Sequence, residues 1–547
     1  MTEPSQPQSG GSFDYVIVGA GSAGCILANR LSEDPNNSVC LLEAGPPDRH
    51  VMIKIPLGIM YLMEHKRLNW RFWTTDQKDA GNRPVYIPRG KTVGGSSSIN
   101  GMVYMRGHRL DYDDWAALGN AGWSYKEVLP YFKRTENNEV FGETPYHGTG
   151  GPMNVVNVDS YSPLVDIMCD AARQMQMPVT DDFNGKQQEG FGKRQFTIRG
   201  GRRESTATAF LHPVRHRKNL TVVTDAMAER VTFDGKRANG VDVFVKGRKR
   251  HLEARREVIV SSGAIASPTI LLRSGVGPAE EISRHGIAMV HKLPGVGRNL
   301  RDHLTVPLQH LSPTTIPYGL SWKTAPWVAW NFLKYPFTGK GLPSNPILHA
   351  GGFIRTEPTL DRPNIQFILS PALRTPGGRT GIGHGFGLLV ILLRPKSIGE
   401  IRLSGPAYDA RPEIDARFLS DAADLQLMVD GFKLARRFVR APAWDKVRGE
   451  ECTPGPSVAS DDDVRNYIRT MASTVFHPVG TCKMGHDPDA VVDDQLRVRG
   501  IEGLRVVDAS IMPTLIGGNT AAPTMMIAEK ASDMILGKPP LPAAENV

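Results

Sequence analysis

A glycine-rich run near the start of the sequence has the spacing of a phosphate-binding turn. It reads G-A-G-S-A-G from Gly19 to Gly24 and directly follows the apolar residues 15–18. A short apolar run of this kind is typical of a strand buried in a parallel sheet. Apolar residues then recur at helical spacing over 23–31, which predicts a helix that begins inside the glycine run. The free amides at the start of that helix would bind an anionic phosphate group.

Each glycine of the run has a distinct structural role, and an acidic residue follows at the distance expected for binding a ribose. Gly19 permits the tight turn, Gly21 lets a ligand approach the backbone, and Gly24 lets the helix pack closely on the strand. A second expected strand, residues 38–42, leads to Glu43, about 20 residues after the glycines. A carboxylate there can accept hydrogen bonds from ribose hydroxyls and disfavours a 2′-phosphate. The pattern therefore predicts a bound dinucleotide and does not distinguish FAD from NAD.

A second glycine-rich and serine-rich segment occupies residues 88–107, with the sequence PRGKTVGGSSSINGMVYMRG. One interpretation is a flexible surface loop, because these residue types favour turns. The segment also carries an unusual density of backbone and hydroxyl donors. We therefore favour a second interpretation, in which these donors bind the phosphates or the flavin of a cofactor rather than solvent.

These motifs resemble the glucose-methanol-choline (GMC) oxidoreductase family. The family pattern G-K-x-x-G-G-S-S-x-x-N is present here as Gly90, Lys91, Gly94, Gly95, Ser96, Ser97 and Asn100. Further stretches resemble the family at residues 263–278, 293–304, 476–485 and 504–535. The resemblance runs from residue 13 to about residue 535 and looks closest to bacterial FAD-dependent alcohol and choline dehydrogenases.

The resemblance implies an α/β (α+β) fold with two domains. A Rossmann-like FAD-binding domain would comprise residues 12–160, 206–304 and 475–538. A substrate-binding domain, residues 161–205 and 305–474, would be inserted into it and built on a large mixed or antiparallel sheet with flanking helices. The apolar run 386–393 reads as a buried strand, since it is far short of the ~20 residues that span a bilayer.

The resemblance also implies which residues hold FAD. The expected cofactor contacts are Gly19, Gly21, Ser22, Ala23, Gly24, Glu43, Ala44, Trp70, Val93, Gly94, Gly95, Ser98, Asn100, Gly101, Met102, Val103, Ala228, Asp508, Ala509, Asn519 and Thr520. Some relatives have a histidine bonded covalently to the flavin, and Ile99 stands at that position here. Isoleucine cannot form such a bond, so FAD is expected to be non-covalent, and no metal site is expected.

Oxidation of an alcohol by a flavin requires a base for the hydroxyl proton and a hydride acceptor, which is the flavin itself. Histidine suits the role of base, but the chain has 15 histidines, and most are expected in structural or surface roles. His477 differs because Pro478 restrains its backbone and the following turn presents its imidazole from a loop. By resemblance, His477 is the base of an H-P-x-G-T motif that lies beside the flavin.

Asn519 is the expected partner of His477, because relatives carry asparagine or histidine at this position. On its own, an asparagine after two glycines reads as a turn residue. A predicted helix, residues 523–535, begins just after it with Pro523 in the first turn and its apolar residues on one face. The start of that helix would point its amides at the cofactor, where reduction leaves negative charge.

The sequence does not identify the substrate or the electron acceptor. A primary alcohol is the leading expectation, with choline as the alternative, and Ile59, Met60, Met63 and Trp73 are candidates to line an apolar pocket. The acceptor is a quinone or another carrier for a dehydrogenase, or dioxygen for an oxidase. Light-driven fatty acid decarboxylases share the fold but lack the histidine that this chain keeps as His477, so that function is a remote alternative.

The amino-acid composition argues against several other classes of protein. The net charge is +9, but the basic residues form no recognisable nucleic-acid module. The densest cluster, residues 246–257, is most simply interpreted as a solvated hairpin, with contact to an anionic membrane surface as the alternative. Five scattered cysteines argue against a disulfide framework or a zinc site. The first residues lack the basic and apolar regions of a secretory signal. We therefore expect a cytoplasmic enzyme, with peripheral attachment to the inner membrane left open.

Overall fold

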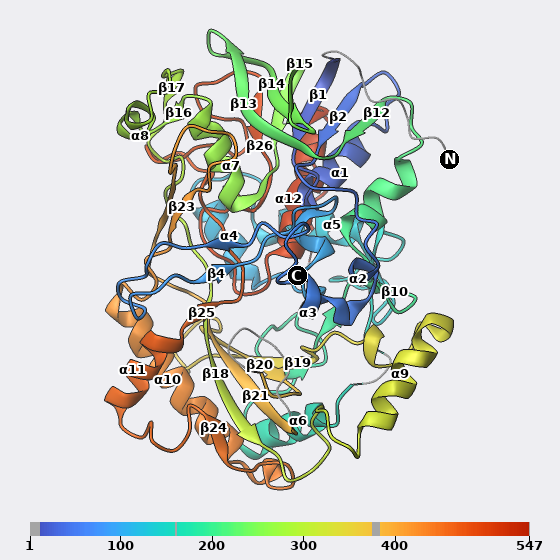
Figure 1. Ribbon diagram of the computed structural model, residues 1–547, viewed down its shortest axis with the longest axis vertical. Helices are drawn as coiled ribbons and strands as arrows, with labels where there is room; N and C mark the ends of the chain where they lie inside the picture. The colour runs from blue at the N-terminus through green and yellow to red at the C-terminus, as the bar shows by residue number, and fades with distance from the viewer. Residues whose placement is uncertain (1–10, 159–160, 375–382, 546) are drawn as a thin grey trace.

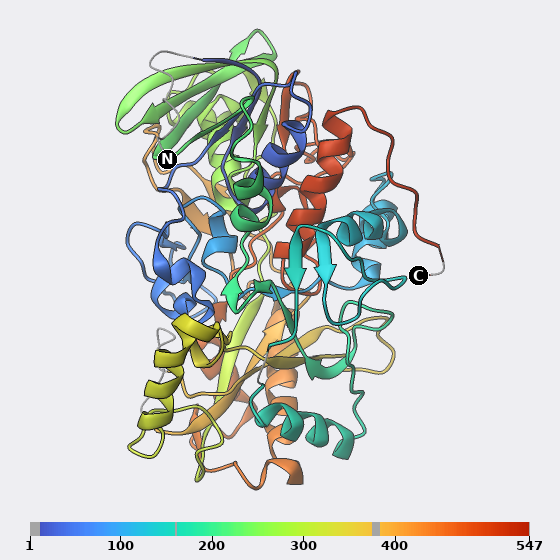
Figure 2. The same ribbon diagram turned by 90° about the vertical axis from the view of Figure 1, so that its right-hand side faces the viewer.

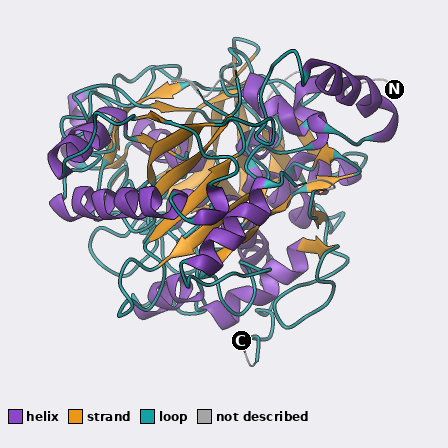
Figure 3. Ribbon diagram, turned by 90° about the horizontal axis from the view of Figure 1, so that it is seen from below, coloured by secondary structure: helices purple, strands orange, loops and turns teal. Residues whose placement is uncertain are grey.

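A computed structural model describes residues 11–158, 161–374, 383–545 and 547, and its architecture is set by two seven-stranded sheets. Figure 1 shows the first sheet in the upper half of the molecule and the second in the lower half. Seen from below, in Figure 3, the strands lie inside a surround of helices. The predicted α/β fold with a large second sheet is confirmed.

The first sheet contains the predicted dinucleotide-binding strands. Its order is β12 (Leu220–Val223), β2 (Val39–Leu42), β1 (Ser12–Val18), β15 (Arg248–Val260), β14 (Arg237–Val245) and β13 (Ala226–Asp234), with β26 (Leu504–Val506) also on β15. The strands β12, β2, β1, β15 and β26 run parallel to one another. Strand β14 runs antiparallel to both of its neighbours, β15 and β13. The basic cluster forms the start of β15, after a two-residue turn at Lys246 and Gly247, so the predicted hairpin is confirmed.

Helix α1 (Ser22–Leu31) begins inside the glycine run, as predicted. A Cβ on Gly24 would lie 1.9 Å from the carbonyl oxygen of Gly19, so only glycine allows the helix to pack this closely on the turn. Arg30, in the last turn of α1, forms a 2.8 Å ion pair with the fully buried Glu529 of α12 (Ala521–Ile535). The two helices lie side by side in Figure 2, to the right of the first sheet.

The predicted C-terminal helix is present as α12, and it is buried on every side rather than on its apolar face alone. Residues 522–533 of α12 are all buried, including the charged Glu529, Lys530 and Asp533. Arg134 pairs with both carboxylates at 2.8 Å, and the ammonium of Lys530 lies 4.9 Å from the centroid of the Tyr131 ring. Because each charge has a partner, the helix tolerates contact with the protein on every side.

The second sheet is antiparallel in the order β24 (Glu451–Thr453), β18 (Leu304–Leu311), β21 (Gly385–Leu392), β20 (Ile365–Ser370), β19 (Ala350–Ile354) and β8 (Gly190–Lys193), with β25 (Ser473–Thr474) also on β18. The predicted buried strand over 386–393 is confirmed as β21. The boundaries of the two domains stay a prediction.

The two faces of the second sheet have different neighbours. Alternate residues such as Phe367 and Val390 share a core with α6 (Leu164–Gln174), α10 (Ala422–Val439) and α11 (Asp461–Met471). Ile368 and Ile391 point the other way and pack with Met102, in the second glycine-rich segment. The sheet is thereby held against the region expected to bind the cofactor.

Shorter elements connect these layers. They include α2 (Val51–Lys54), η1 (Pro56–Gly58), α3 (Ile59–Leu62), β3 (Phe72–Trp73), β4 (Tyr86–Ile87), η2 (Gly95–Ser98), β5 (Val103–Tyr104), α4 (Arg109–Ala117), α5 (Tyr125–Thr135), β9 (Gln195–Phe196), α7 (Gly263–Arg273), α8 (Ala279–Arg284), α9 (Ala325–Thr338) and η5 (Leu342–Ser344).

The close approach at Gly24 can be tested by adding one methyl group. We expect Gly24→Ala to destabilise the protein by about 1–3 kcal/mol, because the turn or the helix must move to relieve the overlap. Urea unfolding followed by circular dichroism measures this. Gly405→Ala is the matched control, since a Cβ there meets nothing within 4 Å and its φ is ordinary. Equal unfolding midpoints for the two variants would contradict the packing argument.

Candidate active site

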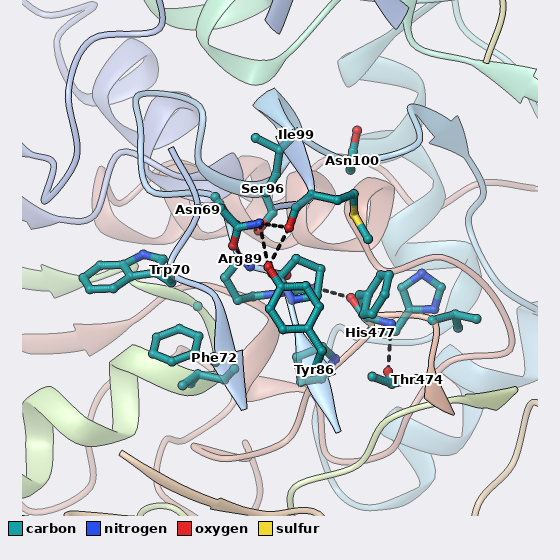
Figure 4. A pocket seen from close by; sticks show the side chains of 18 of the residues that line it. Asn69, Trp70, Phe72, Tyr86, Arg89, Ser96, Ile99, Asn100, Thr474 and His477 are labelled. Atoms are coloured by element: carbon teal, nitrogen blue, oxygen red, sulfur yellow. Dashed lines mark hydrogen bonds between the residues drawn. The ribbon is translucent and has the colours of Figure 1, made fainter. Parts of the chain in front are cut away.

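A cavity of about 1750 Å³ lies between the two sheets. Its lining extends from the β1–α1 turn, through the segment 88–107, to the loop that carries His477 and the start of α12. Figure 4 shows Ser96, Ile99 and Asn100 on one side, Trp70 and Phe72 on another, and His477 on a third. Typical small-molecule pockets are roughly 300–1,000 Å³, so this cavity has room for a large cofactor together with a substrate.

The two glycine-rich segments pack directly on each other at one end of this cavity. The amide of Gly94 donates to the carbonyl of Ala20 at 2.7 Å. A Cβ on Gly95 would lie 2.6 Å from the Cα of Gly21. Gly19 and Gly94 have φ of 108° and 87°, which glycine adopts readily. The second segment is therefore packed against the first glycine turn, with which it forms the candidate phosphate cradle, and its interpretation as a flexible surface loop is wrong.

Glu43 lies at the end of β2, where an acid was expected to meet a ribose. Its carboxylate accepts hydrogen bonds from the amides of Ala20, at 3.1 Å, and Gly45, at 2.8 Å. Burial raises its pKa to about 7 despite these donors. Further hydroxyl donors, such as those of a ribose, would stabilise the charged form, so the site fits the nucleoside part of a dinucleotide.

Most of the residues expected to hold FAD line this cavity. They are Gly19, Gly21, Ser22, Ala23, Glu43, Ala44, Trp70, Gly95, Asn100, Gly101, Met102, Val103, Ala228, Asp508, Ala509, Asn519 and Thr520. The other four, Gly24, Val93, Gly94 and Ser98, shape the cradle from behind its surface. Ser98, for example, is fully buried and donates to the carbonyl of Val93 at 2.8 Å.

The start of α12 faces the same cavity. Its first residues Thr520, Ala521 and Thr524 belong to the lining. The unpaired amides of the first turn and the helix dipole favour negative charge there. Asp508, two residues after β26, also lines the cavity. Its carboxylate accepts hydrogen bonds from the amide of Gly263 and the hydroxyl of Ser267, both in α7, at 2.8 and 2.5 Å.

His477 lies in the loop that follows β25. Its backbone amide donates to Asp302 at 2.8 Å, and the other oxygen of that carboxylate accepts from the hydroxyl of Thr474. The loop runs antiparallel to residues 301–304, which lead into β18. The imidazole is only 8% exposed and lines the cavity, so it is more enclosed than a loop position by itself suggests.

Hydrogen bonds fix which ring nitrogen of His477 carries a proton. Nε2 of His303 lies 3.1 Å from the carbonyl oxygen of Leu393, which can only accept, so this nitrogen is the donor. Nδ1 of neutral His303 is then an acceptor, and it lies 2.9 Å from Nδ1 of His477. His477 must donate from Nδ1, which leaves a lone pair on Nε2.

Asn519 faces that lone pair. Its amide nitrogen lies 3.0 Å from Nε2 of His477, and its carbonyl oxygen accepts from Arg194 at 3.0 Å. The loop before Asn519 is held by Asp111, whose carboxylate accepts from the amide of Gly517 at 2.7 Å. His477 and Asn519, predicted from separate parts of the sequence, are thus in contact. The hydrogen bonds continue from Asn519 to the buried guanidinium of Arg194.

Charge and burial both act on this group. Burial, with the neighbouring His303 and the positive charges of Arg89 and Arg194, holds the pKa of His477 well below its usual value. Burial lowers the pKa of His303 to about 3, so both rings are neutral at pH 7. A neutral histidine beside an amide donor can take a proton from a hydroxyl group and orient its oxygen.

Two residues of this group were not predicted. His303 lies in the stretch 293–304, which was noted only for its resemblance to the family. Arg194 lies between β8 and β9, is 1% exposed, and has its Nη1 without a hydrogen-bond partner in the described part of the chain. It is one of 65 basic residues, and no local pattern marks it.

The candidate pocket residues also lie where they were expected. Ile59, Met60, Met63 and Trp73 line the cavity, together with Phe72. Ile99 belongs to the lining too, at the position of the flavin-linked histidine of some relatives.

Comparisons with known proteins agree with this geometry. Over 96% of both chains, the sequence is 45% identical to alcohol dehydrogenase [acceptor] of Pseudomonas putida. It is 44% identical to an oxygen-dependent choline dehydrogenase of Burkholderia ambifaria, over 97% of this chain and 94% of the relative.

Solved structures show the same fold. Pyridoxine 4-oxidase of Mesorbium loti superimposes with a TM-score of 0.88 at 30% identity, covering 96% of this chain and 100% of the other. A formate oxidase of Aspergillus oryzae RIB40, studied for its FAD modification, gives 0.91 at 26% identity, covering 97% and 99%.

Family models described as GMC oxidoreductase match residues 13–305 and 395–528. These matches include both glycine-rich segments in the first range and both His477 and Asn519 in the second. The chain belongs to the GMC oxidoreductase family.

Proposed function

We propose that this protein oxidises a primary alcohol to an aldehyde with non-covalently bound FAD. The observation that carries the proposal is the contact between Nε2 of His477 and the amide of Asn519, in the same cavity as the dinucleotide cradle. When bound, FAD supplies the hydride acceptor. The glycine-rich turns, Glu43 and the start of α12 would hold it, and Ile99 offers no atom for a covalent link.

His477, Asn519 and Arg194 have different roles toward the substrate hydroxyl group. In this structure the lone pair on Nε2 of His477 accepts from the amide nitrogen of Asn519, 3.0 Å away. When an alcohol binds, that hydrogen bond is exchanged: the Asn519 amide donates to the substrate oxygen, and Nε2 of His477 accepts the hydroxyl proton. Nη1 of Arg194 is a further donor without a partner among the described residues, and its charge stabilises the developing alkoxide.

The local charge favours a neutral alcohol over choline. Arg89 and Arg194 both act electrostatically on His477. Burial lowers the pKa of Arg89 to about 10, although the charge of Asp302 opposes this shift, and burial lowers the pKa of Arg194 to about 9. A quaternary ammonium beside the reacting hydroxyl would be repelled by these charges. Choline oxidation, suggested by the 44% identical relative, remains the alternative.

We propose a dehydrogenase that passes electrons to a quinone or a similar carrier rather than to dioxygen. The alcohol dehydrogenase [acceptor] relative supports this reading, and its identity of 45% is as high as that of the choline enzymes. We also propose a cytoplasmic location, with peripheral attachment to the inner membrane left open. Among the described residues, no helix has both the length and the apolar character needed to cross a bilayer. Anaerobic reduction by an alcohol, repeated in air with a peroxide assay, separates the two acceptor classes.

Removal of the base should stop the reaction without releasing the cofactor. We expect His477→Ala to slow anaerobic flavin reduction by an aliphatic primary alcohol ~100-fold or more. Stopped-flow absorbance measures the rate, and the visible spectrum measures bound FAD. His216→Ala, at an exposed histidine, is the control. Normal reduction by His477→Ala would refute the assignment of the base.

The lowered pKa of His477 gives the reaction a defined pH dependence. A folded-state pKa below the usual value means that the imidazole stays neutral as the pH falls through 6.5. We therefore expect the rate of flavin reduction at saturating alcohol to change by less than about twofold between pH 8 and pH 6. A loss of rate with a midpoint near pH 6.5 would show an unperturbed base.

The role of Arg194 can be tested with a matched pair of substrates. 3,3-Dimethylbutan-1-ol has the shape of choline without its charge. We expect wild-type kcat/KM to favour the neutral alcohol by about 10-fold or more, and Arg194→Gln to reduce that preference. Glutamine can still donate to Asn519, whereas Arg194→Lys keeps the charge and should keep the preference. An unchanged preference in Arg194→Gln would remove the electrostatic argument against choline.

A further inference from the structure

Apolar side chains are exposed on and next to α9. Half of the large hydrophobic residues that are exposed in the described chain lie between residues 320 and 337. They are Leu320, Trp322, Trp327, Trp330, Phe332, Leu333 and Phe337, here named the α9 surface, and their exposed fractions run from 49% for Trp327 to 90% for Phe337. Such a concentration marks a surface that binds something apolar.

The helix itself presents these side chains outward. Trp330, Leu333 and Phe337 follow one another at helical spacing, so they form a stripe along one side. Asn331 is the one residue of α9, all of which is described, that is buried. Figures 1 and 2 both place α9 at the edge of the molecule, with one side against the protein and the other facing outward.

The charge around this surface is of one sign. Residues 303–356 contain no aspartate or glutamate, while Lys323, Lys334 and Lys340 all lie on or next to α9. Lys323 and Lys340 are exposed next to the aromatic residues. Tryptophan beside lysine is typical of protein segments at the interface of an anionic membrane. A second copy of the chain would bring like charges together, so it fits less well.

The α9 surface is connected to the cavity. The helix is followed by η5, and the residues just after it, Pro346, Ile347 and Leu348, line the cavity. In turn, η5 contacts η1, and the next helix, α3, contributes Ile59 and Met60 to the same lining. A bilayer seated on α9 would therefore lie beside the apolar side of the cavity.

We propose that the α9 surface docks the enzyme on an anionic lipid bilayer, with the apolar side of the cavity turned toward the membrane. The docking rests on the exposed residues alone. Its consequence rests on the proposed function: an apolar alcohol, which partitions into lipid, then reaches the cavity from the bilayer.

Vesicle binding by the FAD-loaded enzyme tests the proposal. The probes are vesicles of phosphatidylcholine alone and of phosphatidylcholine with phosphatidylglycerol, in sedimentation and in tryptophan fluorescence. We expect binding to the anionic vesicles, weakened by salt, with a blue shift of the emission. The triple variant Trp330→Ser/Leu333→Ser/Phe337→Ser should bind at least ~10-fold more weakly, and Lys323→Glu/Lys340→Glu should lose the preference for anionic lipid.

Controls separate this proposal from the catalytic one. Leu118→Ser/Met289→Ser removes two exposed apolar residues elsewhere and should bind like the wild type. All variants should reduce their flavin normally with a short, water-soluble alcohol, so a failure of the proposed function would appear there and not in the sedimentation. Equal vesicle binding by wild type and triple variant would overturn the proposal. A wild-type dimer that the triple variant abolishes, without vesicle binding, would assign the surface to a second copy instead.

Discussion

The hydrogen bond between the two imidazoles of His303 and His477, 2.9 Å long, determines what the site can do. Its direction is set outside the pair, because the carbonyl of Leu393 can only accept. That carbonyl directly follows β21, so the end of the second sheet decides which nitrogen of His477 is free. The tautomer of the base is therefore a consequence of how the second sheet docks on the loop after β25.

The same docking brings the base to the cofactor site. One face of the second sheet packs on Met102, which belongs to the segment that also rests on the first glycine turn through Gly95 and Gly21. The strand pair β5–β9 continues this contact and leads straight to Arg194. Neither sheet carries the complete candidate site, since the first glycine turn belongs to the first sheet and His477 lies where the second sheet meets it.

Local patterns predicted the parts of this site that depend on local structure. The glycine run, the helix that it begins, and the strand after it required only sequence neighbours, and all were confirmed. Other features depend on tertiary contacts. The proton direction at His477 and the position of Arg194 follow from packing between distant segments. The complete burial of α12 required partners for Glu529 that no pattern near it reveals. Helix α9 shows the opposite case. A helix so rich in aromatic residues is typical of a buried core, and only the structure shows that these side chains are exposed.

The lowered pKa of His477 makes it always available but also a weak base, since a low pKa means a low affinity for the proton that it must accept. The surrounding cations resolve this conflict. In the proposed reaction, the charges of Arg89 and Arg194 that oppose protonation of the imidazole would also stabilise an alkoxide beside it and Asn519, which would lower the pKa of the alcohol. What matters for the transfer is the difference between the two pKa values, and the cations reduce both. A neutral alcohol benefits fully from this arrangement, whereas a cationic one must first enter against the same charges.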